Sequence, residues 1–458
     1  MLNENNQYSY LRKELLLRFF NFLFDSDNTL DINKIPYAMI PSKGDPRRCC
    51  IYKDREMIKY RLLSLMGYDL SGDFDESPSL FEFFSRCEKE KAPSLPPLSV
   101  ISAACSSCRN KQYRVTELCR GCLARPCQTI CPAGALTMKN GKAIIDGERC
   151  VNCGKCQKAC PYSAIVYIPV PCEEVCPVGA IVKKEGHAIE IDRQKCISCG
   201  RCTRSCPFGA IVEKSHAVPL AAALKLKKDI SLMIAPSLYN QLPGSDSQIL
   251  EALKAIGFTR VYELQESAEI VAAEEGRELV ERMEKGESFM TTSCCPAYVE
   301  TVKKHMPDLA SHVSRTPSPM VAGAEILKDQ FPHSTIVFAG PCMAKKVEAY
   351  ENGIVDLVMN FEELGTLLIS RAVEILNYPE VEREPVFEMG RGFAHSGGVA
   401  RAVEASLGRK VGYGQIDGIS SKTLRLMKTW TKRAPSEHLV EVMACEGGCS
   451  RGPCSLNS

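Results

Sequence analysis

Two periodicities of apolar residues divide the second half of the chain into strands and helices. Short, uninterrupted apolar runs are typical of buried strands, and they occur at 230–235, 261–264, 335–339 and 355–359. Segments with apolar residues at helical spacing lie at 245–256, 268–284 and 361–376. Strands that alternate with helices predict an α/β catalytic domain, with parallel sheets flanked by helices and functional residues at the strand ends.

The first hundred residues show helical spacing only. We expect a small helical domain over 1–98 without a catalytic signature, which ends in a proline-rich linker at 92–97. Cys49 and Cys50 have no CxxC partner nearby, which favours incidental thiols over a metal site. The expected helices are Leu11–Phe24, Arg55–Met66 and Ser79–Cys87.

Cysteine is the residue type whose abundance is most informative about this chain. The chain has 458 residues, a formal net charge of +2 and 25 cysteines. This charge predicts neither nucleic-acid nor membrane binding, and no apolar run is long enough to span a bilayer. Residues 1–6 lack a secretory pattern, and Arg47-Arg48 lies too deep for a twin-arginine signal. We therefore expect a cytoplasmic protein whose cysteines are reduced and mostly bound to metal.

Two cysteine runs match the bacterial ferredoxin pattern CxxCxxCxxxCP in full. In this pattern three thiolates bind one 4Fe-4S cubane and the fourth binds a neighbouring cubane, so each run requires a partner run. Zinc sites and disulfides, the alternatives, do not require this spacing. Apolar alternation at 142–146 and 187–192 predicts short ferredoxin-like strands. The full runs are Cys150, Cys153, Cys156 and Cys160, and Cys196, Cys199, Cys202 and Cys206.

The first full run has a partner in a slightly stretched run over 119–131. The two runs predict two cubanes, bound by Cys119, Cys122, Cys127 and Cys160, and by Cys150, Cys153, Cys156 and Cys131. For the second full run only fragments exist, at 105–108 and 172–177. We expect these fragments to form one split run. An inner α+β unit over about 111–168 would then be inserted into an outer unit, and the two together would span 99–215.

The split run predicts two further cubanes. Their ligands would be Cys196, Cys199, Cys202 and Cys176 for one cluster, and Cys105, Cys108, Cys172 and Cys206 for the other. The sixteen cysteines between 105 and 206 would then supply four clusters with none left over. In the alternative, Cys105 and Cys108 bind zinc or nothing, and three clusters remain. The pattern resembles the four-cluster electron-transfer subunits of molybdenum oxidoreductases.

Three segments of the domain predicted over 216–458 carry further cysteines, at 292–298 (TSCCPAY), 341–348 (PCMAKKVE) and 441–449 (EVMACEGGC). Together they resemble the signature motifs of the iron-only (FeFe) hydrogenases. The family's H-cluster joins a 4Fe-4S cubane, through one cysteine, to a diiron subcluster with carbon monoxide, cyanide and a bridging amine dithiolate. By motif position the resemblance implies ligation by Cys295, Cys342, Cys445 and Cys449, with Cys449 as the bridge.

The resemblance also implies a proton path. Cys294 would remain a free thiol that passes protons to the bridging amine, a role that suits the acidity of a thiol. Glu275, Glu278 and Ser314 would continue the path, with Glu278 as the next station after Cys294. A solvated helix face is the alternative for the two glutamates, because 272–285 contains many other charges.

Four further residues take roles from their motif positions. Lys345 and Ser237 would donate hydrogen bonds to iron-bound cyanide, an anionic acceptor. Glu348 would pair with a lysine, and Met443 would pack against the diiron unit. Without the resemblance, each of these residue types is an ordinary surface or core residue.

The sequence departs from the family's pattern near these motifs. Tyr298 and Ala297 stand where well-studied members have tryptophan and glycine, and Gly340 replaces a methionine that would pack near the bridging carbonyl. The sequence has an additional cysteine, Cys454, five residues after Cys449. We expect Cys454 to be a surface residue rather than a thiol close to the cofactor. These differences are typical of a less-studied branch of the family and leave the implied reaction type intact.

The implied activity is 2H+ + 2e− ⇌ H2, with a soluble ferredoxin as electron carrier and the cluster of the Cys196 run nearest the active site. Maturation proteins would supply the diiron unit. The alternatives are a hydrogen sensor with slow turnover, a non-catalytic iron–sulfur carrier and a polyferredoxin-like electron-transfer subunit. A non-catalytic carrier typically lacks the relay cysteine and the motif lysine, whereas Cys294 and Lys345 are both present.

Overall fold

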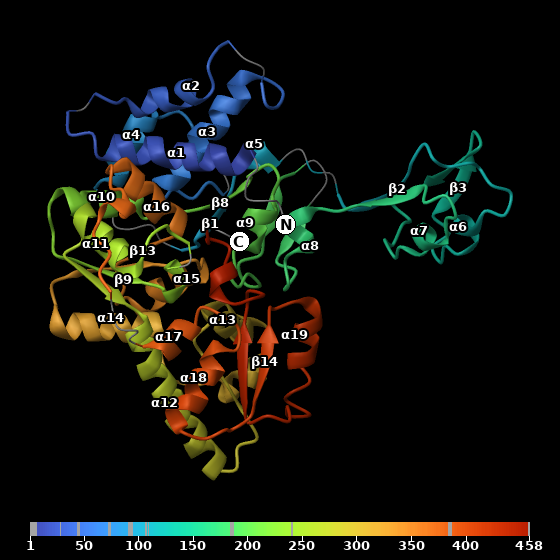
Figure 1. Cartoon of the computed structure of the whole chain (residues 1–458). Coiled ribbons are helices and arrows are strands. Elements are labelled where there is room, and N and C mark those ends of the chain that lie inside the picture. Colours follow the sequence, from blue (N-terminus) through green and yellow to red (C-terminus); the bar gives the residue numbers. More distant parts are fainter. Residues whose placement is uncertain are drawn as a thin grey trace.

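The structure is a computed structural model of the chain. It describes residues 7–27, 29–43, 46–71, 75–89, 95–105, 108, 110–183, 187–239, 241–382 and 387–456. Residues 1–6, which were interpreted as lacking a secretory pattern, lie outside these ranges. The first part of the predicted linker, 92–94, also lies outside them. Figure 1 shows N-terminal helices packed on a large body, and a small unit that stands out from both.

The N-terminal region is helical, as its apolar spacing predicted. Ser79 begins its last helix with a capping box, in which its side chain accepts from the backbone N–H of Glu82 and the Glu82 carboxylate accepts in return. Phe19, Phe20 and Leu62 are fully buried in a core that continues into the body. The helices are α1 (Gln7–Leu23), α2 (Ile35–Met39), α3 (Ile51–Leu65) and α4 (Leu80–Cys87), with a 3-10 turn at Ile32–Lys34.

Residues on either side of the predicted insertion meet in the first of two small two-stranded sheets. β1 (Leu98–Val100) pairs antiparallel with β8 (Ile211–Glu213), and β6 (Ile181–Lys183) pairs antiparallel with β7 (Ile189–Ile191). Such closure is what a nested arrangement of two units requires. The short helices of this part are α5 (Ser102–Cys105), α8 (Pro171–Glu174) and α9 (Arg201–Ser205).

Residues 111–168 form the unit that stands out in Figure 1, which we call the head. Its stalk is the antiparallel pair of β2 (Gln112–Val115) and β5 (Ile165–Ile168). Beyond the stalk lie a hairpin of β3 (Leu136–Lys139) and β4 (Lys142–Ile145) and the helices α6 (Pro126–Thr129) and α7 (Lys155–Ala159). The head has a small core of its own, separate from the cores of the body.

The body contains two parallel sheets. The first has the order β10-β9-β12-β13 and confirms the predicted parallel strands. The second, β11-β15-β14, was not anticipated, because β11 has two residues and β14 lacks a continuous apolar run. The strands are β9 (Ile230–Ile234), β10 (Arg260–Glu263), β11 (Met290–Thr291), β12 (Thr335–Ala339), β13 (Leu357–Met359), β14 (Tyr413–Asp417) and β15 (Leu439–Met443).

Helices flank both sheets, and two predicted boundaries were wrong. The helix expected over 361–376 ends at Ser370, followed by a separate turn at Ile375–Asn377, and the helix expected from 268 begins at Gln265. Within the described ranges no helix combines the length and apolar character of a membrane span. The helices are α10 (Ala217–Lys225), α11 (Asp246–Ile256), α12 (Gln265–Glu284), α13 (Pro296–His305), α14 (Pro319–Gln330), α15 (Ala344–Asn352), α16 (Phe361–Ser370), α17 (Glu388–Gly392), α18 (Gly398–Leu407) and α19 (Ser421–Met427).

Candidate active site

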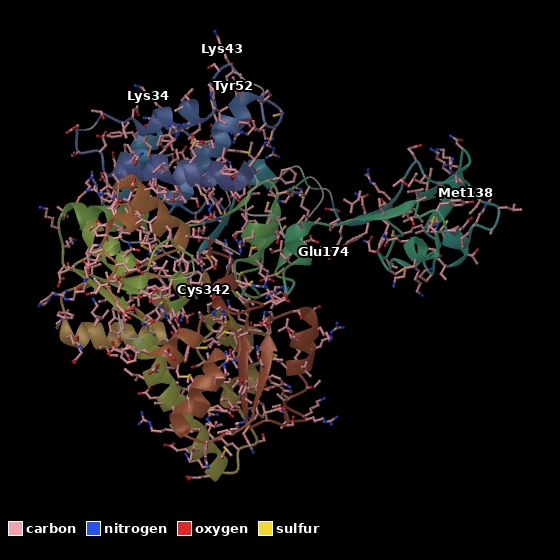
Figure 2. All side chains as sticks on the ribbon, in the orientation of Figure 1. Lys34, Lys43, Tyr52, Met138, Glu174 and Cys342 are labelled. Atoms are coloured by element: carbon pink, nitrogen blue, oxygen red, sulfur yellow. The ribbon has the colours of Figure 1, made fainter. Side chains whose placement is uncertain are left out.

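The carboxyl ends of strands from both sheets open onto one cavity. Ser237 follows β9 and Cys342 follows β12 in the first sheet, while Cys294 follows β11 and Cys449 follows β15 in the second. All four residues line the same cavity, which has a volume of about 70 Å³. Parallel strands place their ends at one edge, so two such edges that face each other bring distant segments together. Figure 2 shows Cys342 in the interior of the molecule.

Four cysteines predicted as ligands gather beside this cavity. Burial raises the pKa of Cys342 to about 11, and the charge of Cys295 raises it further. Burial likewise raises the pKa of Cys449 to about 12, with added repulsion from Cys342 and Cys295. The pKa of Cys445 lies well above its ordinary value through burial and the charges of Cys342 and Cys449. Raised pKa values keep these four groups as neutral thiols, and a cationic iron–sulfur core would stabilise them together as thiolates.

Two polar groups in the cavity fit an anionic or hydrogen-bond-accepting ligand. The hydroxyl of Ser237 is buried and has no hydrogen-bond partner among the described residues. Lys345 lines the same cavity and donates to Glu348 at 2.6 Å and to Ser318 at 2.8 Å. Burial lowers the pKa of Lys345, but Glu348 outweighs this effect and the net shift is upward. The lysine is therefore a fixed cation at the cavity wall.

Two substitutions relative to the family's pattern have packing explanations. A Cβ atom at Gly340 would lie 2.3 Å from the Phe338 ring, so Phe338 occupies the space that a larger side chain would need. Phe338 also lines the cavity, together with Met443. Tyr298 is fully buried, and its hydroxyl donates to Thr291 at 2.8 Å. Of these residues Phe338 forms part of the cavity wall, while Tyr298 packs in a hydrophobic core cluster.

The predicted order of the two glutamates is corrected by the structure. Cys294 is buried, and after burial itself the charge of Glu275, not Glu278, contributes most to the upward shift of its pKa. Glu275 is fully buried on α12 and accepts at one oxygen from the backbone N–H of Ser293 at 3.0 Å and from its hydroxyl at 3.2 Å. Its other oxygen has no hydrogen-bond partner among the described residues. Glu275 is therefore the carboxylate nearer Cys294.

Glu278 lies further out and is held by several donors. Ser314 donates to it at 2.7 Å, and Arg282 donates at 2.7 Å and 3.0 Å. Burial acts to raise the pKa of Glu278, but these donors outweigh it and the pKa is lowered. Ser314 also acts to lower the pKa of Glu275, so its hydroxyl lies near both carboxylates. Glu275, Ser314 and Glu278 form a polar chain that leads from Cys294 toward the outer face of α12.

The buried Glu275 predicts a pH-dependent stability. Burial raises its pKa from 4.5 to about 7, with a further contribution from Glu278. Below pH 4.5 the carboxyl group is protonated in both the folded and the unfolded chain, and its contribution to the free energy of unfolding is fully present. This contribution is lost as the pH rises through 7, because the unfolded chain releases the proton more readily than the folded chain does. A Glu275→Gln variant should therefore be more stable than the wild type at pH 8, by on the order of 3 kcal/mol, and show a flatter profile.

Unfolding midpoints between pH 5 and pH 8 measure this effect. Glu274→Gln, which changes an exposed neighbour on the same helix, provides the matched control and should leave the profile unchanged. Equal slopes for the wild type and Glu275→Gln would contradict the proposed burial of an ionisable carboxyl.

Several cysteines of the cluster region have members of their own predicted group as neighbours. Burial raises the pKa of Cys127, and its charged neighbours are Cys160 and Cys122; Cys156 is likewise buried and neighbours Cys150 and Cys131. In the outer unit, burial raises the pKa of Cys172 to about 12, and its neighbours are Cys206, Cys105 and Cys108. The pKa of Cys199 rises to about 11 through burial, with Cys196 and Cys176 adjacent. Among the described residues no group is tight enough to hold a single metal ion, and the corners of a four-iron cube lie further apart.

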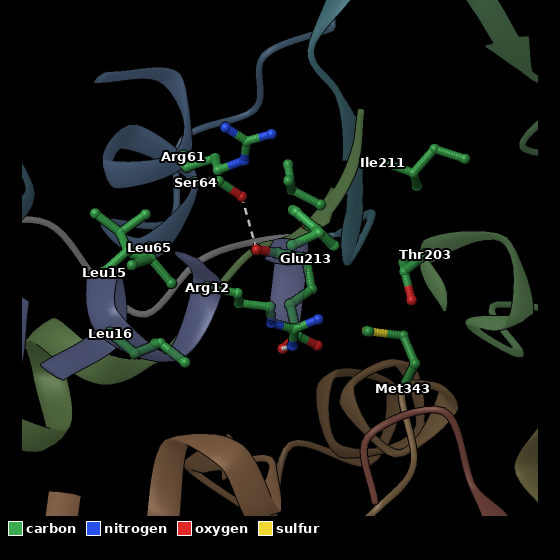
Figure 3. Close-up of a pocket in the computed structure, with 12 residues that line it drawn as sticks. Arg12, Leu15, Leu16, Arg61, Ser64, Leu65, Thr203, Ile211, Glu213 and Met343 are labelled. Atoms are coloured by element: carbon green, nitrogen blue, oxygen red, sulfur yellow. Dashed lines mark hydrogen bonds and ion pairs between the residues drawn. The ribbon is translucent and has the colours of Figure 1, made fainter. Parts of the chain in front are cut away.

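Cys454 corrects one expectation, because it is buried rather than a surface residue. Its thiol lies 3.8 Å from the Glu213 carboxylate, and Arg12 pairs with the same carboxylate at 3.2 Å. Arg12 and Glu213 line a second cavity of about 40 Å³, shown in Figure 3, with Met343 among its other lining residues. A buried network of charged groups therefore joins the N-terminal helices, β8 and the body directly behind Cys342.

Two residues with structural roles were missed from the sequence. Arg201, on α9, donates to the carbonyl of Ile419 at 2.6 Å and to the carbonyl of Ala444, which precedes Cys445. Glu441, fully buried on β15, accepts from the backbone N–H groups of Gly397 and Ala400 at the start of α18. Both act on residues from other elements, so no local spacing could have indicated them.

The fold and the cysteine groups define a multi-cluster iron–sulfur protein. Residues 228–453 match the family described as the iron only hydrogenase large subunit, C-terminal domain, and this domain of the chain belongs to that family. Residues 118–164 match a 4Fe-4S dicluster domain, and residues 166–217 match an LdpA Fe-S cluster-binding domain. The family assignment implied by the three cysteine segments is therefore confirmed.

Individual relatives match at low identity. Iron hydrogenase 1 of Clostridium pasteurianum is 26% identical over 300 residues, which cover 52% of this chain and 52% of that protein. The periplasmic Fe hydrogenase large subunit of Nitratidesulfovibrio vulgaris is 27% identical over 257 residues, 45% of this chain and 61% of that protein. The chain spans about half the length of these curated relatives. A solved FeFe-hydrogenase HydA1 variant from Chlamydomonas reinhardtii has 18% identity and a TM-score of 0.42 over 53% of this chain and 84% of that one.

Proposed function

We propose that the chain is an FeFe hydrogenase that interconverts protons and H2, with electrons delivered through 4Fe-4S clusters. The observation that carries this proposal is the shared cavity. It joins a free thiol, Cys294, and a buried cation, Lys345, to two members of the four-cysteine group, Cys342 and Cys449. An iron–sulfur carrier needs the cysteine group but neither the thiol nor the cation beside an enclosed space.

The residues of this chain would hold the H-cluster and move protons to it. Cys295, Cys342, Cys445 and Cys449 would bind the cubane, and the diiron subcluster would supply the metal at which protons and electrons combine. Lys345 and Ser237 would orient its cyanide ligands, with Glu348 fixing the lysine. Met443 would exclude water at the cavity wall. Protons would pass along Glu278, Ser314, Glu275 and Cys294.

Four accessory clusters are proposed from the sixteen cysteines of 105–206. The cluster of the Cys196 run would deliver electrons to the active site, because Cys199 is among the charged neighbours of Cys445. A Cβ atom at Gly200 would lie 2.8 Å from Pro453 and 3.2 Å from Met343, so the loop that carries Cys199 packs tightly against both segments of the active site. Arg201, the next residue, strengthens this contact through its hydrogen bonds to the carbonyl groups of Ile419 and Ala444.

Replacing Arg201 tests the contact between the Cys199 loop and the active-site segments, which we call the junction. Arg201→Met removes two charge-assisted hydrogen bonds across the junction and should destabilise it by roughly 1.5–3 kcal/mol for each bond. With a protein electron donor, the rate of H2 evolution should fall. The iron content should fall by a smaller fraction, so loss of clusters alone would not account for the slower rate. Arg193→Met, which removes an exposed bond to Ser71 on the same region, is the matched control. Unchanged rates and midpoints in Arg201→Met would contradict the role of this contact.

The test of the proposed function is H2 evolution from reduced methyl viologen, on protein matured with its diiron unit and handled without oxygen. Infrared bands of iron-bound carbon monoxide and cyanide should accompany this activity. Rapid turnover supports the hydrogenase, turnover that is detectable but very slow supports a hydrogen sensor, and the absence of both bands and turnover overturns the proposal. A soluble ferredoxin and the maturation proteins are the partners that a cytoplasmic enzyme of this kind would use.

A further inference from the structure

The surface of the head differs from the surface of the body in its apolar content. Of the twenty-one large apolar side chains that are exposed among the described residues, seven lie in the head. They are Leu118, Leu123, Ile130, Ile144, Val151, Tyr162 and Val166. The head contains about an eighth of the chain, so exposed apolar groups are concentrated there, and such concentrations mark interaction sites.

Three of these side chains belong to segments that bind one predicted cluster. Leu118 precedes Cys119, Leu123 follows Cys122, and Tyr162 follows Cys160 by two residues. Their exposed fractions are 57%, 96% and 49%. We call these three residues the apolar patch of the head. The patch therefore lies on segments that carry ligands of the Cys119 cluster, while Ile130 and Val151 are exposed beside Cys131 and Cys150 of the second cluster.

The charge of the head is also distinctive. Residues 111–168 contain nine Lys or Arg and three Asp or Glu, a formal charge of +6 with the cysteines counted as neutral, whereas the whole chain carries +2 on the same basis. Two bound 4Fe-4S clusters with thiolate ligands would lower the charge of the head by about 4 and leave it basic. The remaining residues therefore carry −4. Arg120 and Arg125 are exposed, flank the apolar patch in sequence, and have no carboxylate partner among the described residues. An apolar centre with unpaired basic residues beside it is complementary to an acidic partner and would repel a second copy of the head.

The stalk gives the head space for such a partner. The head has its own core, and Figure 1 shows it standing clear of the body. At the base of the stalk, Lys111 pairs with Glu173 at 3.5 Å and the hydroxyl of Tyr167 donates to Glu174 at 2.5 Å. Both glutamates lie on α8, which also carries Cys172 of the outer unit; Figure 2 shows Glu174 at this base and Met138 at the far side of the head.

We propose that the head is the docking site for an acidic one-electron carrier protein, which contacts the apolar patch and exchanges electrons with the Cys119 cluster. The proposal rests on the proposed function for the destination of the electrons but not for the docking itself. Each exchange passes one electron between the reduced carrier and the oxidised cluster, or the reverse, with no bond formed. The small charge of the whole chain concealed this surface, since the basic head and the acidic remainder nearly cancel.

The experiment uses matured full-length protein, an acidic 4Fe-4S ferredoxin as the probe, and reduced methyl viologen as a donor that needs no protein docking. Arg120→Glu and Leu123→Ser change the docking surface. Lys422→Glu and Leu226→Ser make the same changes at exposed positions of the body. Iron content is measured for every variant, because Arg120 and Leu123 are next to predicted ligands.

At low ionic strength, Arg120→Glu should raise the KM for ferredoxin about tenfold and weaken its dependence on salt, while the viologen rate stays unchanged. Leu123→Ser should raise the KM with little change in salt dependence. A KM unchanged in both head variants, or raised equally by Lys422→Glu, overturns the proposal. A wild-type dimer that Leu123→Ser converts to monomers would instead assign the patch to a second copy and also overturns it.

A binding measurement separates this proposal from the proposed function. The Kd of the ferredoxin for each variant is measured without turnover. If the wild type produces no H2 with viologen but binds ferredoxin with the same dependence on Arg120 and Leu123, the hydrogenase proposal fails and the docking proposal stands. If viologen turnover is rapid and binding is indifferent to the head variants, the docking proposal fails alone.

Discussion

Replacing Cys294 with alanine should abolish most H2 turnover while leaving the cofactor in place. Cys294 lines the cavity but does not belong to the group of four mutually adjacent cysteines, so its removal should not release iron. It is the only described thiol that lies between this cavity and the polar chain that begins at Glu275. Losing a positioned proton donor and acceptor should slow turnover by roughly 10²–10⁴-fold.

Two measurements distinguish proton transfer from assembly in Cys294→Ala. The infrared bands of iron-bound carbon monoxide and cyanide should persist, although their frequencies can shift, and the rate of H2 evolution should fall. Cys87→Ala, which removes a half-buried thiol of the N-terminal helices, should change neither measurement. Loss of the infrared bands in Cys294→Ala would show that this cysteine holds the cofactor and would contradict the assigned role.

The family could be predicted, and the ligand groups proposed, because both rest on local information. Each CxxC pair fixes two thiolates within one turn of chain, and the apolar runs that became β9 and β12 needed no knowledge of their partners. Even the split pair of Cys105 and Cys108 could be placed, because sixteen cysteines divide evenly into four groups. The structure brings both of them beside Cys172 and Cys206.

The remaining features depend on contacts between distant segments. Glu275 and Glu278 lie three residues apart on one helix face, and only the approach of Ser293 shows which carboxylate is nearer Cys294. The position of Cys454 near the C-terminus suggested exposure, whereas Glu213 and the N-terminal helices cover it. The contact between Phe338 and Gly340 is local, but it depends on the orientation of the Phe338 ring, which residue spacing does not encode.

Replacing Lys345 with methionine should affect both stability and the diiron unit. Lys345 and Glu348 have side chains only 11% and 14% exposed, and they pair at 2.6 Å. Removing the cation leaves a buried carboxylate without its partner, which destabilises a protein by about 3–5 kcal/mol. It also removes the one described lysine that lines the cavity, and with it the donor proposed for cyanide.

The double variant Lys345→Met/Glu348→Gln separates these two effects. It removes the unpaired carboxylate, so the unfolding midpoint should return toward that of the wild type. The infrared bands of the diiron unit should remain weak or absent in both variants, because neither can donate the charge-assisted bond, whereas Glu348→Gln alone should keep them. Recovery of full band intensity and H2 turnover in the double variant would mean that Lys345 serves only to neutralise Glu348, and that Ser237 and the cysteines suffice to hold the cofactor.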